Sequence, residues 1–421
     1  MFSPLNIRIG FYLALRHIKR ASIWTTSLIV FVMLLTFLNL VVVTGILVGL
    51  VAGINSAYQT HYIGDVIISP LEGEDYIKQS PSILALLDTL PQVTGRTTRY
   101  LTSGTLEAGY KSYVGTGQNP NFVSLQVAGI DPSAEDAFTS LGGMILSGAY
   151  LDQNDYDQVL IGSQRLAQYS AFAGGGGGLL TVLEDVDVGS VLRLRIGDVE
   201  REVTVKGIID SKLDELSLRL YMPATQLRGL IGRNDYNLSE IAMRLTPGTD
   251  PIVFKDLLVR SGVSDYGVVE TFEESIPDGV QEITNTFAML GNMISSVGLV
   301  VASITIFIVI FINALTRRKF IGILKGIGID GKAIEISYMF QSLFYAAIGS
   351  GIGLAVLYGF LVPFVAAHPI DFPFSDGILV APIPDTMVRV ALLVVATVIA
   401  GYIPARMIVK KNTLDSILGR N

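Results

Sequence analysis

The sequence contains no cysteine and only three histidines among its 421 residues. The absence of cysteine excludes a disulfide framework and any site built from thiolates. The histidines, His17, His61 and His368, are too scattered for a metal site made from a histidine cluster. Charge is also scarce: 16% of the residues are charged, where an ordinary soluble protein has about 25%. Because half of the residues are hydrophobic (50%), this scarcity indicates membrane-spanning segments.

The remaining charge is unevenly distributed. Residues 61–285 carry 16 Lys and Arg against 31 Asp and Glu, a net charge of −15. The rest of the chain carries 14 against 6, a net charge of +8, which together give the chain's −7. An acidic soluble block therefore lies between basic, membrane-like segments. A block of this sign disfavours nucleic acid as a partner.

Four long apolar stretches are present, at residues 21–64, 286–316, 336–370 and 386–405, and Arg389 is the only charged residue in them. About 20 helical residues cross the hydrocarbon core of a bilayer, so each stretch suffices for one crossing. The first stretch is too long for the apolar part of a cleaved signal peptide, so we expect it to be retained as a transmembrane helix. The first three exceed one crossing, so their helices are expected to project beyond the bilayer or to end in loops.

These stretches predict a polytopic α-helical membrane protein with four transmembrane helices and a large α/β extracytoplasmic domain inserted between helices 1 and 2. The first 20 residues have the pattern of an amphipathic helix on the cytoplasmic face of the membrane, or of an extension of the first helix with basic anchors. The expected boundaries are 1–20 for this helix, 21–60 for transmembrane helix 1, 61–285 for the extracytoplasmic domain, 286–421 for the membrane domain, and about 286–316, 336–366 and 386–408 for transmembrane helices 2–4.

Lys and Arg flank the apolar stretches asymmetrically. They precede the first helix, lie between the second and third, and follow the fourth, whereas the connection at 366–385 has none. The positive-inside rule then places both termini and the 317–335 loop in the cytoplasm. Residues 61–285 are expected outside. The sequence thus predicts a multi-pass protein of the cytoplasmic (inner) membrane.

The outer block alternates strand-like and helix-like segments. Alternating or β-branched residues predict strands at 124–131, 191–196, 201–210, 218–223 and 240–245. Helical spacing predicts short helices at 163–172, 223–231 and 251–262. The five glycines at 174–178 predict a loop tip.

A glycine-rich segment lies between the second and third apolar stretches. Gly326, Gly328 and Gly331 have the spacing of a dinucleotide-binding turn, and Gly331-Lys332 ends a near match to a P-loop with Ala333 in place of the required Ser or Thr. Either motif needs a buried strand and a βαβ unit, for which a cytoplasmic loop of this length has no room. We therefore expect this chain to bind no nucleotide or other cofactor.

The same loop predicts a short helix at residues 317–328. Apolar residues recur at helical spacing, and basic residues lie on the other faces. The helix is either a membrane-surface element without a partner or a docking helix for a cytoplasmic protein. The candidate docking residues are Arg318, Phe320, Ile323, Leu324, Lys325 and Ile327.

The stretch "NALTRRKFIGILKGIGIDGKAIEISYMFQSLFYAAIGSGIGLAVLYG" resembles the signature of the FtsX/MacB/LolC superfamily of ABC permeases. Pro404, Ala405 and Arg406 are similar to the closing motif of this superfamily. The outer block resembles the MacB and LolC extracytoplasmic domain, in segments such as "VAGIDPSAEDAF" and "VGSVLRLRI". Two positions depart from the superfamily pattern: Phe320 stands in place of a Glu, and Ser342 in place of a Gly.

The resemblance implies the membrane subunit of an ABC transporter that passes ATPase-driven motion to its outer domain and exports or extracts a lipoprotein, lipid, peptide or drug. The chain itself would not be an enzyme, because a separate cytoplasmic ATPase subunit would bind ATP and magnesium. Further expected partners are a second permease copy, identical or not, and an extracytoplasmic adaptor or substrate-carrier protein. The residues expected to pack helices within the chain or between two copies are Gln341, Gly349, Gly351 and Gly353.

Three alternatives stay open at this point. One is an FtsX-like regulator that activates an extracytoplasmic cell-wall hydrolase. Another is a membrane-anchored extracytoplasmic enzyme, which is disfavoured because the outer block has no GxSxG or HExxH motif. The third is a secondary transporter, which is disfavoured by the absence of inverted repeats.

Overall fold

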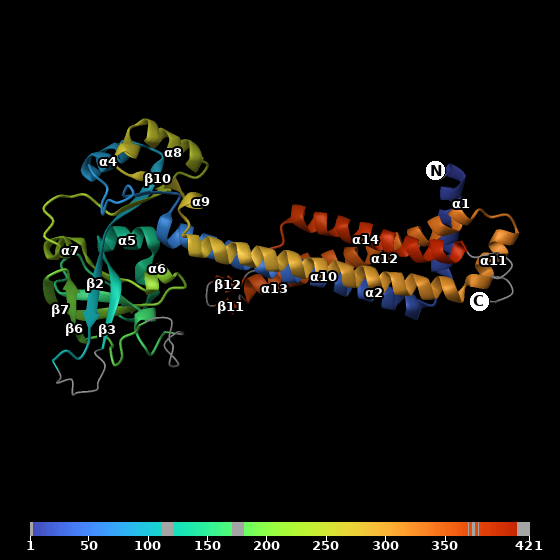
Figure 1. The fold of residues 1–421 in the computed structure, drawn as a ribbon, viewed down its shortest axis with the longest axis horizontal. Coiled ribbons are helices and arrows are strands. Elements are labelled where there is room, and N and C mark those ends of the chain that lie inside the picture. Colours follow the sequence, from blue (N-terminus) through green and yellow to red (C-terminus); the bar gives the residue numbers. More distant parts are fainter. Residues whose placement is uncertain are drawn as a thin grey trace. The chain divides into compact units, whose positions relative to one another are not determined.

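The computed structural model describes residues 3–111, 121–170, 181–368, 370–372, 375–377 and 379–410 (Figure 1). The chain divides into two compact units. The first, here called the membrane unit, comprises Met1–Gly53, Gln281–Phe372 and Asp376–Asn421. The second, here called the outer domain, comprises Ile54–Val280 and Pro373–Ser375.

A ten-stranded sheet forms the core of the outer domain. Six of its strands close into a ring, because β2 pairs with β3, and the pairing continues through β8, β5, β7 and β6 back to β2. The strands are β1 (Val66–Ser69), β2 (Val93–Glu107), β3 (Phe122–Ile130), β4 (Ile145–Gly148), β5 (Gln158–Gly162), β6 (Val191–Ile196), β7 (Val199–Ile209), β8 (Leu220–Pro223), β9 (Glu240–Leu245) and β10 (Val268–Thr271).

The long strand β2 joins this ring to a second part of the sheet. Its first half pairs with β9, which continues to β1 and β10. Figure 1 shows α4 and α8 beside this second part and α5, α6 and α7 around the ring. The helices are α4 (Ser80–Leu87), α5 (Pro132–Thr139), α6 (Asp214–Ser217), α7 (Ala224–Leu230), α8 (Pro251–Arg260) and α9 (Phe272–Ser275).

Local sequence accounts for much of this domain. Strand β6 buries alternate side chains, as its pattern predicts, and β6 and β9 have the expected bounds. Helix α8 begins where Asp250 accepts a hydrogen bond from the backbone N–H of Ile252, and it lies within the expected 251–262.

The helix expected at 163–172 is wrong. A 3-10 turn ends at Arg165, and Leu166, which is fully buried, forms an isolated bridge with Leu183. Tertiary packing of Leu166 therefore overrides the local helical spacing. The end of this segment and the glycine run at 174–178 lie outside the described residues.

The membrane unit is helical. Its helices are α1 (Pro4–Lys19), α2 (Ile23–Leu38), α3 (Thr44–Tyr58), α10 (Asp278–Thr316), α11 (Arg318–Gly326), α12 (Gly331–Val356), α13 (Val362–Ala367) and α14 (Ile383–Val409), with π-helical turns at Asn39–Val43, Gln59–Ile63 and Leu357–Leu361. Two short strands, β11 (Ile370–Phe372) and β12 (Ser375–Gly377), pair with each other.

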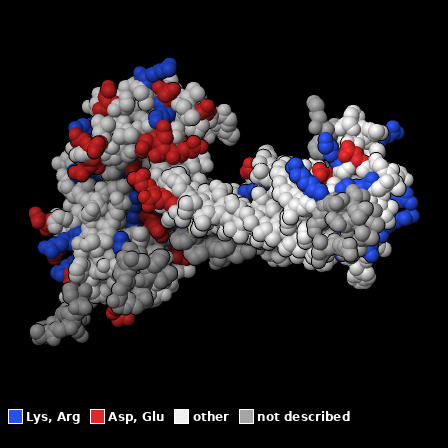
Figure 2. Space-filling view, turned by 45° about the vertical axis from the view of Figure 1, so that its right-hand side comes forward, with Lys and Arg blue, Asp and Glu red and all other residues white. Residues whose placement is uncertain are grey.

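Four helices in the described part of the chain are long and apolar enough to cross a membrane: Thr26–Ile63, Asp278–Thr316, Gly331–Ala367 and Ile383–Val409. The expected fold class, four such helices with a large α/β domain between the first and the second, is confirmed. The second helix begins at Asp278 rather than at residue 286. Figure 2 shows a largely uncharged surface along these helices and Lys and Arg gathered toward one end of the membrane unit.

Helix α1 is a separate helix and not an extension of α2, since α1 ends at Lys19 and α2 begins at Ile23. Its buried side consists of small and polar residues, Asn6, Gly10, Ala14 and His17. Its large apolar side chains are exposed, among them Leu5, Phe11, Tyr12 and Leu15. This arrangement is typical of a helix that packs on its neighbours with a narrow face and presents an apolar face to lipid.

The absence of cysteine allows a direct test of membrane orientation. We expect a single cysteine at the exposed Asn234 of the outer domain to react with an impermeant thiol reagent on intact cells, and one at the exposed Lys332 to react only after the membrane is opened. Labelling of position 332 from outside would contradict the orientation, and both variants should insert to the same level as the parent chain.

Candidate functional site: a surface helix and a clamped membrane helix

Helix α11 presents an apolar stripe to its surroundings. Phe320, Ile323 and Ile327 are 47%, 51% and 71% exposed. Leu324 does not belong to this stripe, because its side chain is 7% exposed and packs in the core of the membrane unit with Ile321. Leu324 is therefore not available on the surface as a docking residue, because its side chain points inward while those of Ile323 and Ile327 point outward.

Contacts with two other helices hold α11 in place. The Lys325 ammonium donates a hydrogen bond to the backbone carbonyl of Val409, near the end of α14, at 2.9 Å. The Phe320 ring, although 47% of the residue is exposed, lies 5.9 Å from the His17 ring of α1, centre to centre. Arg318 is half-buried at the first helical position. Helix α11 thus contacts both α1 and α14 directly.

The turn that follows α11 ends in an acidic helix cap. Gly328 adopts a φ of +93°, which favours glycine. Asp330 caps α12: its carboxylate accepts hydrogen bonds from the Lys332 backbone N–H at 3.1 Å and from the Asn6 amide at 2.7 Å. The hydrogen bond from the Lys332 backbone, with a smaller effect from the Asn6 amide, holds the pKa of Asp330 below its usual range. A carboxylate therefore occupies the helix end at which a P-loop would bind phosphate.

The small residues of α12 divide into two sets. A Cβ on Gly349 would overlap Met33, and one on Gly353 would overlap Phe37, so both glycines allow α12 to approach α2 of the same chain. Gly351 points into open space. The amide of Gln341 is buried and lies 3.3 Å from Nδ1 of His17 in α1. Three of the four packing residues are thus used within the chain, and only Gly351 faces outward.

The closing motif lies where α14 packs on the core of the membrane unit. Pro404 and Ala405 are buried within α14, whereas the Arg406 guanidinium is exposed and lies 5.7 Å from the centre of the Tyr402 ring. One turn earlier in the same helix, Gly401 accommodates the hydroxyl of Ser342, which a Cβ would overlap. Ser342 fits at this position because the residue opposite it, Gly401, has no side chain.

The first membrane helix ends inside the outer domain. Its last turns, through Ile63, belong to this domain, and Gly64 terminates the helix with a φ of +77°. A Cβ on Gly64 would overlap the carbonyl oxygen of Met243. The helix end is further held by Arg244, which donates hydrogen bonds at 2.9 Å to the carbonyls of Thr60 and Phe138.

A buried charge cluster closes around Tyr62, the last tyrosine of this helix. Arg99 forms salt bridges with Glu135 at 2.8 Å and Glu240 at 3.1 Å, and donates to the Tyr62 carbonyl at 3.0 Å. The Tyr62 hydroxyl donates to Glu240 at 2.8 Å and accepts from Arg219 at 2.7 Å. We call these five residues the helix clamp.

The helix clamp was not found from the sequence. Its members come from the first helix, β2, α5, β9 and the residue before β8, and no local pattern joins positions so far apart. Burial alone would raise the pKa of Glu240, but Arg219 and Arg99 hold it below its ordinary value, so this carboxylate is stabilised in its charged form. A side chain such as Arg99, which is 1% exposed, needs all of these partners.

Comparison with known proteins identifies the class of this chain. Residues 292–413 match the family "FtsX-like permease C-terminal". These residues form an FtsX-like permease domain, and the chain as a whole is similar to ABC permeases of the FtsX/MacB type. It is 26% identical over 251 residues to the macrolide export ATP-binding/permease protein MacB of Hahella chejuensis, covering 57% of this chain and 36% of that protein.

Other relatives are similar. The MacB of Campylobacter fetus subsp. fetus is 24% identical over 355 residues, covering 79% of this chain and 48% of that protein. The chain thus spans about a third to a half of the curated relatives it matches. Among solved structures, the periplasmic region of MacB from Actinobacillus actinomycetemcomitans covers 51% of this chain and 92% of that chain, at 16% identity and a TM-score of 0.35.

The FtsX-like match and the four apolar helices indicate an inner-membrane protein with an extracytoplasmic domain. Among the described ranges, no group of three or more His, Asp and Glu side chains is arranged to hold a metal ion.

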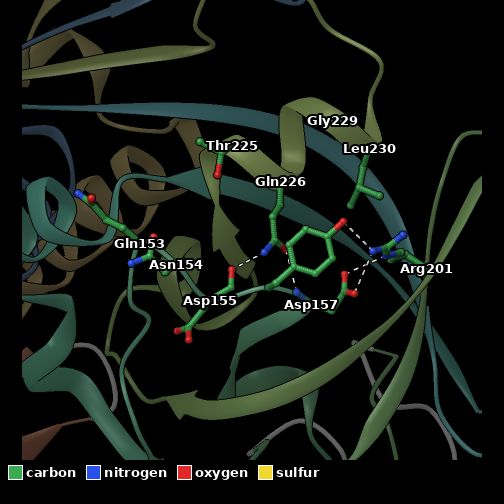
Figure 3. A pocket seen from close by; sticks show the side chains of 10 residues that line it. Gln153, Asn154, Asp155, Asp157, Arg201, Thr225, Gln226, Gly229 and Leu230 are labelled. Atoms are coloured by element: carbon green, nitrogen blue, oxygen red, sulfur yellow. Dashed lines mark hydrogen bonds and ion pairs between the residues drawn. The ribbon is translucent and has the colours of Figure 1, made fainter.

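The permease has an open pocket of about 470 Å³ on its outer domain, beside α7 (Figure 3). Several of its polar side chains bind one another. Arg201 forms a salt bridge with Asp157 at 2.9 Å and donates to the Tyr156 hydroxyl at 2.8 Å, while Gln226 accepts from the Asp157 backbone N–H at 3.0 Å. These contacts brace the loop at residues 155–157 against α7 and β7.

The helix clamp makes a prediction about stability. Replacing Arg99 by Met leaves Glu135 buried without its main counter-charge, and we expect a loss of about 3–5 kcal/mol in the free energy of unfolding. Thermal unfolding of the full permease would measure this. The control is Arg96→Met, which removes a partly exposed salt bridge to Asp88 and should cost less than about 1 kcal/mol. Equal losses in both variants would contradict the structural role of the clamp.

The helix end makes a second prediction. We expect Gly64→Ala to lower the free energy of unfolding by more than about 3 kcal/mol, because it combines a strained φ with overlap on Met243. Gly73 has a φ of +83° and open space around it, so Gly73→Ala should cost only about 1–2 kcal/mol. Limited proteolysis and thermal unfolding would compare the two variants. A loss at position 64 no larger than that at position 73 would show that the end of the helix can shift to accept a side chain.

Proposed function

We propose that this permease is the membrane subunit of an ABC transporter that transmits movement from a cytoplasmic ATPase to its outer domain. The moved substrate would be a lipoprotein, lipid, peptide or drug that is already outside or in the outer leaflet. Two features together carry the proposal. Helix α11 exposes an apolar stripe, and the end of the first membrane helix is held in the outer domain by the helix clamp.

At the cytoplasmic end, α11 is suited to receive the ATPase. Its exposed stripe of Phe320, Ile323 and Ile327 is small, apolar and rigidly backed, which is the character of a binding hot spot. ATP and magnesium would bind to the separate ATPase subunit. Both termini of the permease would lie on this side of the membrane, in agreement with the basic flanks.

At the other end, the helix clamp is suited to transmit displacement. The helical segment from Thr44 runs through Tyr58 and the π-helical turn Gln59–Ile63 without interruption. A rotation or shift of this segment would therefore reach β2, α5 and β9 through Tyr62 and its charged partners. Movement of the outer domain requires no channel for the substrate through the bilayer.

A second permease copy, identical or related, would complete the transporter. The outward-facing Gly351 and the exposed Ile352 of α12 offer a close-packing surface for such a copy. An extracytoplasmic adaptor or carrier protein would receive the substrate. Affinity purification in mild detergent would identify the ATPase and any second permease together.

The second candidate function is regulation of an extracytoplasmic cell-wall hydrolase. The same coupling would then activate a bound enzyme instead of moving a substrate. The two functions are distinguished by what co-purifies with the outer domain: a hydrolase in the one case, and a lipoprotein, lipid, peptide or drug in the other.

Substitution in α11 tests the coupling. We expect Ile323→Asp to reduce permease-stimulated ATP hydrolysis and co-purification of the ATPase at least about tenfold, because a charge in an apolar hot spot typically costs 2 kcal/mol or more. Leu324→Ala, in contrast, removes buried packing and should lower thermal stability first.

The matched control is Lys332→Asp, which introduces an aspartate at an exposed polar position outside α11. ATPase stimulation should survive this change. If Ile323→Asp leaves recruitment and stimulation intact in a stably inserted protein, α11 is a membrane-surface anchor and not the docking element.

A further inference from the structure

The membrane unit contains a cavity of about 420 Å³ between α10 and α14. This volume lies within the range of about 300–1,000 Å³ that is typical of ligand sites. Apolar side chains form part of its wall, and two charged and several polar side chains form the rest. The lining residues are Leu40, Asn292, Ser295, Ser296, Leu299, Asp385, Val388, Arg389 and Leu392.

The polar residues of this cavity lie at the outer edge of the hydrocarbon core. From Thr316, at the inner end of α10, to Ser296 is 20 residues, or about 30 Å at 1.5 Å per residue, which equals the thickness of the core. From Arg406 to Arg389 in α14 is 17 residues, or about 26 Å. Two helices thus independently place the polar end of the cavity at the level of the outer-leaflet headgroups.

Within the described part of the chain, the charged groups of the cavity interact only at longer range: the charge of Asp385 acts on Arg389 across the turn between them. The side chains of Asn292, Asp385 and Arg389 form no hydrogen bond or salt bridge with any residue that the structure describes. Arg389 is only half-exposed, and its position within an apolar helix makes an unpaired guanidinium costly. Ser295 contributes no free group, because its hydroxyl lies 2.7 Å from that of Thr44.

Asp385 and Arg389 lie one turn apart on α14 and carry opposite charge, yet they form no salt bridge with each other. A ligand that carries both an anion and a cation would therefore satisfy them together. A guanidinium favours a phosphate in a two-pronged hydrogen bond, and a carboxylate favours a primary ammonium group. Below these groups, Leu299 and Leu392 offer an apolar wall along which an acyl chain can lie, and Val388 adds an apolar side chain beside Arg389.

We propose that this cavity binds an outer-leaflet phospholipid whose headgroup carries a phosphate and a primary ammonium, as in phosphatidylethanolamine. Arg389 binds the phosphate, Asp385 and the amide oxygen of Asn292 accept from the ammonium, and one acyl chain lies against the apolar wall. The site is independent of the proposed export function, since it requires only that the four helices span a membrane.

An arginine near a helix end also contacts headgroups nonspecifically, so the test must separate a site from an anchor. The full permease is reconstituted in nanodiscs of phosphatidylethanolamine and phosphatidylglycerol, or with phosphatidylcholine in place of phosphatidylethanolamine. It is released in mild detergent, and retained lipid is counted by native mass spectrometry. We expect about one retained phosphatidylethanolamine per chain and at least about tenfold less phosphatidylcholine.

Three variants define the site. Arg389→Gln should lower retention of phosphatidylethanolamine at least about tenfold, and Asp385→Asn should abolish the preference over phosphatidylcholine. Arg8→Gln makes the same chemical change on the exposed side of α1 and should leave retention unchanged. Retention unaffected by Arg389→Gln, or a parent protein without lipid preference, would overturn the proposal.

Cross-linking distinguishes the remaining occupant. A phosphatidylethanolamine with a photoactivatable acyl chain should label peptides that contain Leu299 or Leu392. The chain has no cysteine, so cysteines can be introduced at Ser296 and Leu392 alone. If a second copy covered the cavity, these cysteines would form cross-links between two chains. Cross-linking between chains without lipid labelling of these peptides would show that the cavity is a protein interface.

Discussion

The Tyr62 carbonyl accepts a hydrogen bond from Arg99, a side chain that is itself held between two carboxylates in the interior of the outer domain. This bond joins a membrane helix to a sheet. Removing an arginine and two glutamates from water is costly, and it is tolerated only when every charge has a close partner. Arg99 lies between Glu135 and Glu240 and also binds the Tyr62 carbonyl, so the end of the helix is tied to β2, α5 and β9 by several contacts at once. The proposed transmission of movement depends on these contacts.

The membrane unit is held together by a core of buried apolar side chains and by close approach of its helices. Lipid tails are as apolar as leucine, so contact between helices is favoured where small residues allow backbones to meet. Gly349 and Gly353 do this between α12 and α2, Gly10 between α1 and α12, and Gly401 between α14 and α12. The large residues of α10 and α14 instead face outward, where lipid or a second chain would cover them.

Helix α11 serves two surfaces at once. Ile321 and Leu324 belong to the core of the membrane unit, and Phe320 and Ile323 are exposed on the other side. Nine residues are enough for this division because successive side chains of a helix point about 100° apart. The proposed docking of an ATPase on the exposed side would therefore act on residues that are continuous with the core of the membrane unit.

The sequence by itself determined the four membrane helices and the inserted α/β domain. A bilayer leaves the backbone no alternative to internal hydrogen bonding, so a long apolar stretch is enough to specify a spanning helix. Alternation specified β6 and β9 in the same way, and an aspartate in front of a helical pattern marked the start of α8. Each of these signals lies within a short segment of the chain, so it can be read without knowledge of the tertiary contacts.

Only the tertiary structure decided how the individual side chains are used. Helical spacing grouped Leu324 with Ile323, but the elements that cover α11 assigned them to opposite sides. Spacing could not show that Gly349 meets Met33 while Gly351 meets nothing, nor that residues 62, 99, 135, 219 and 240 form one cluster. The helix expected at 163–172 failed for the same reason, since a bridge to Leu183 buries Leu166. Each of these outcomes depends on contacts between distant segments, whose geometry a local pattern does not contain.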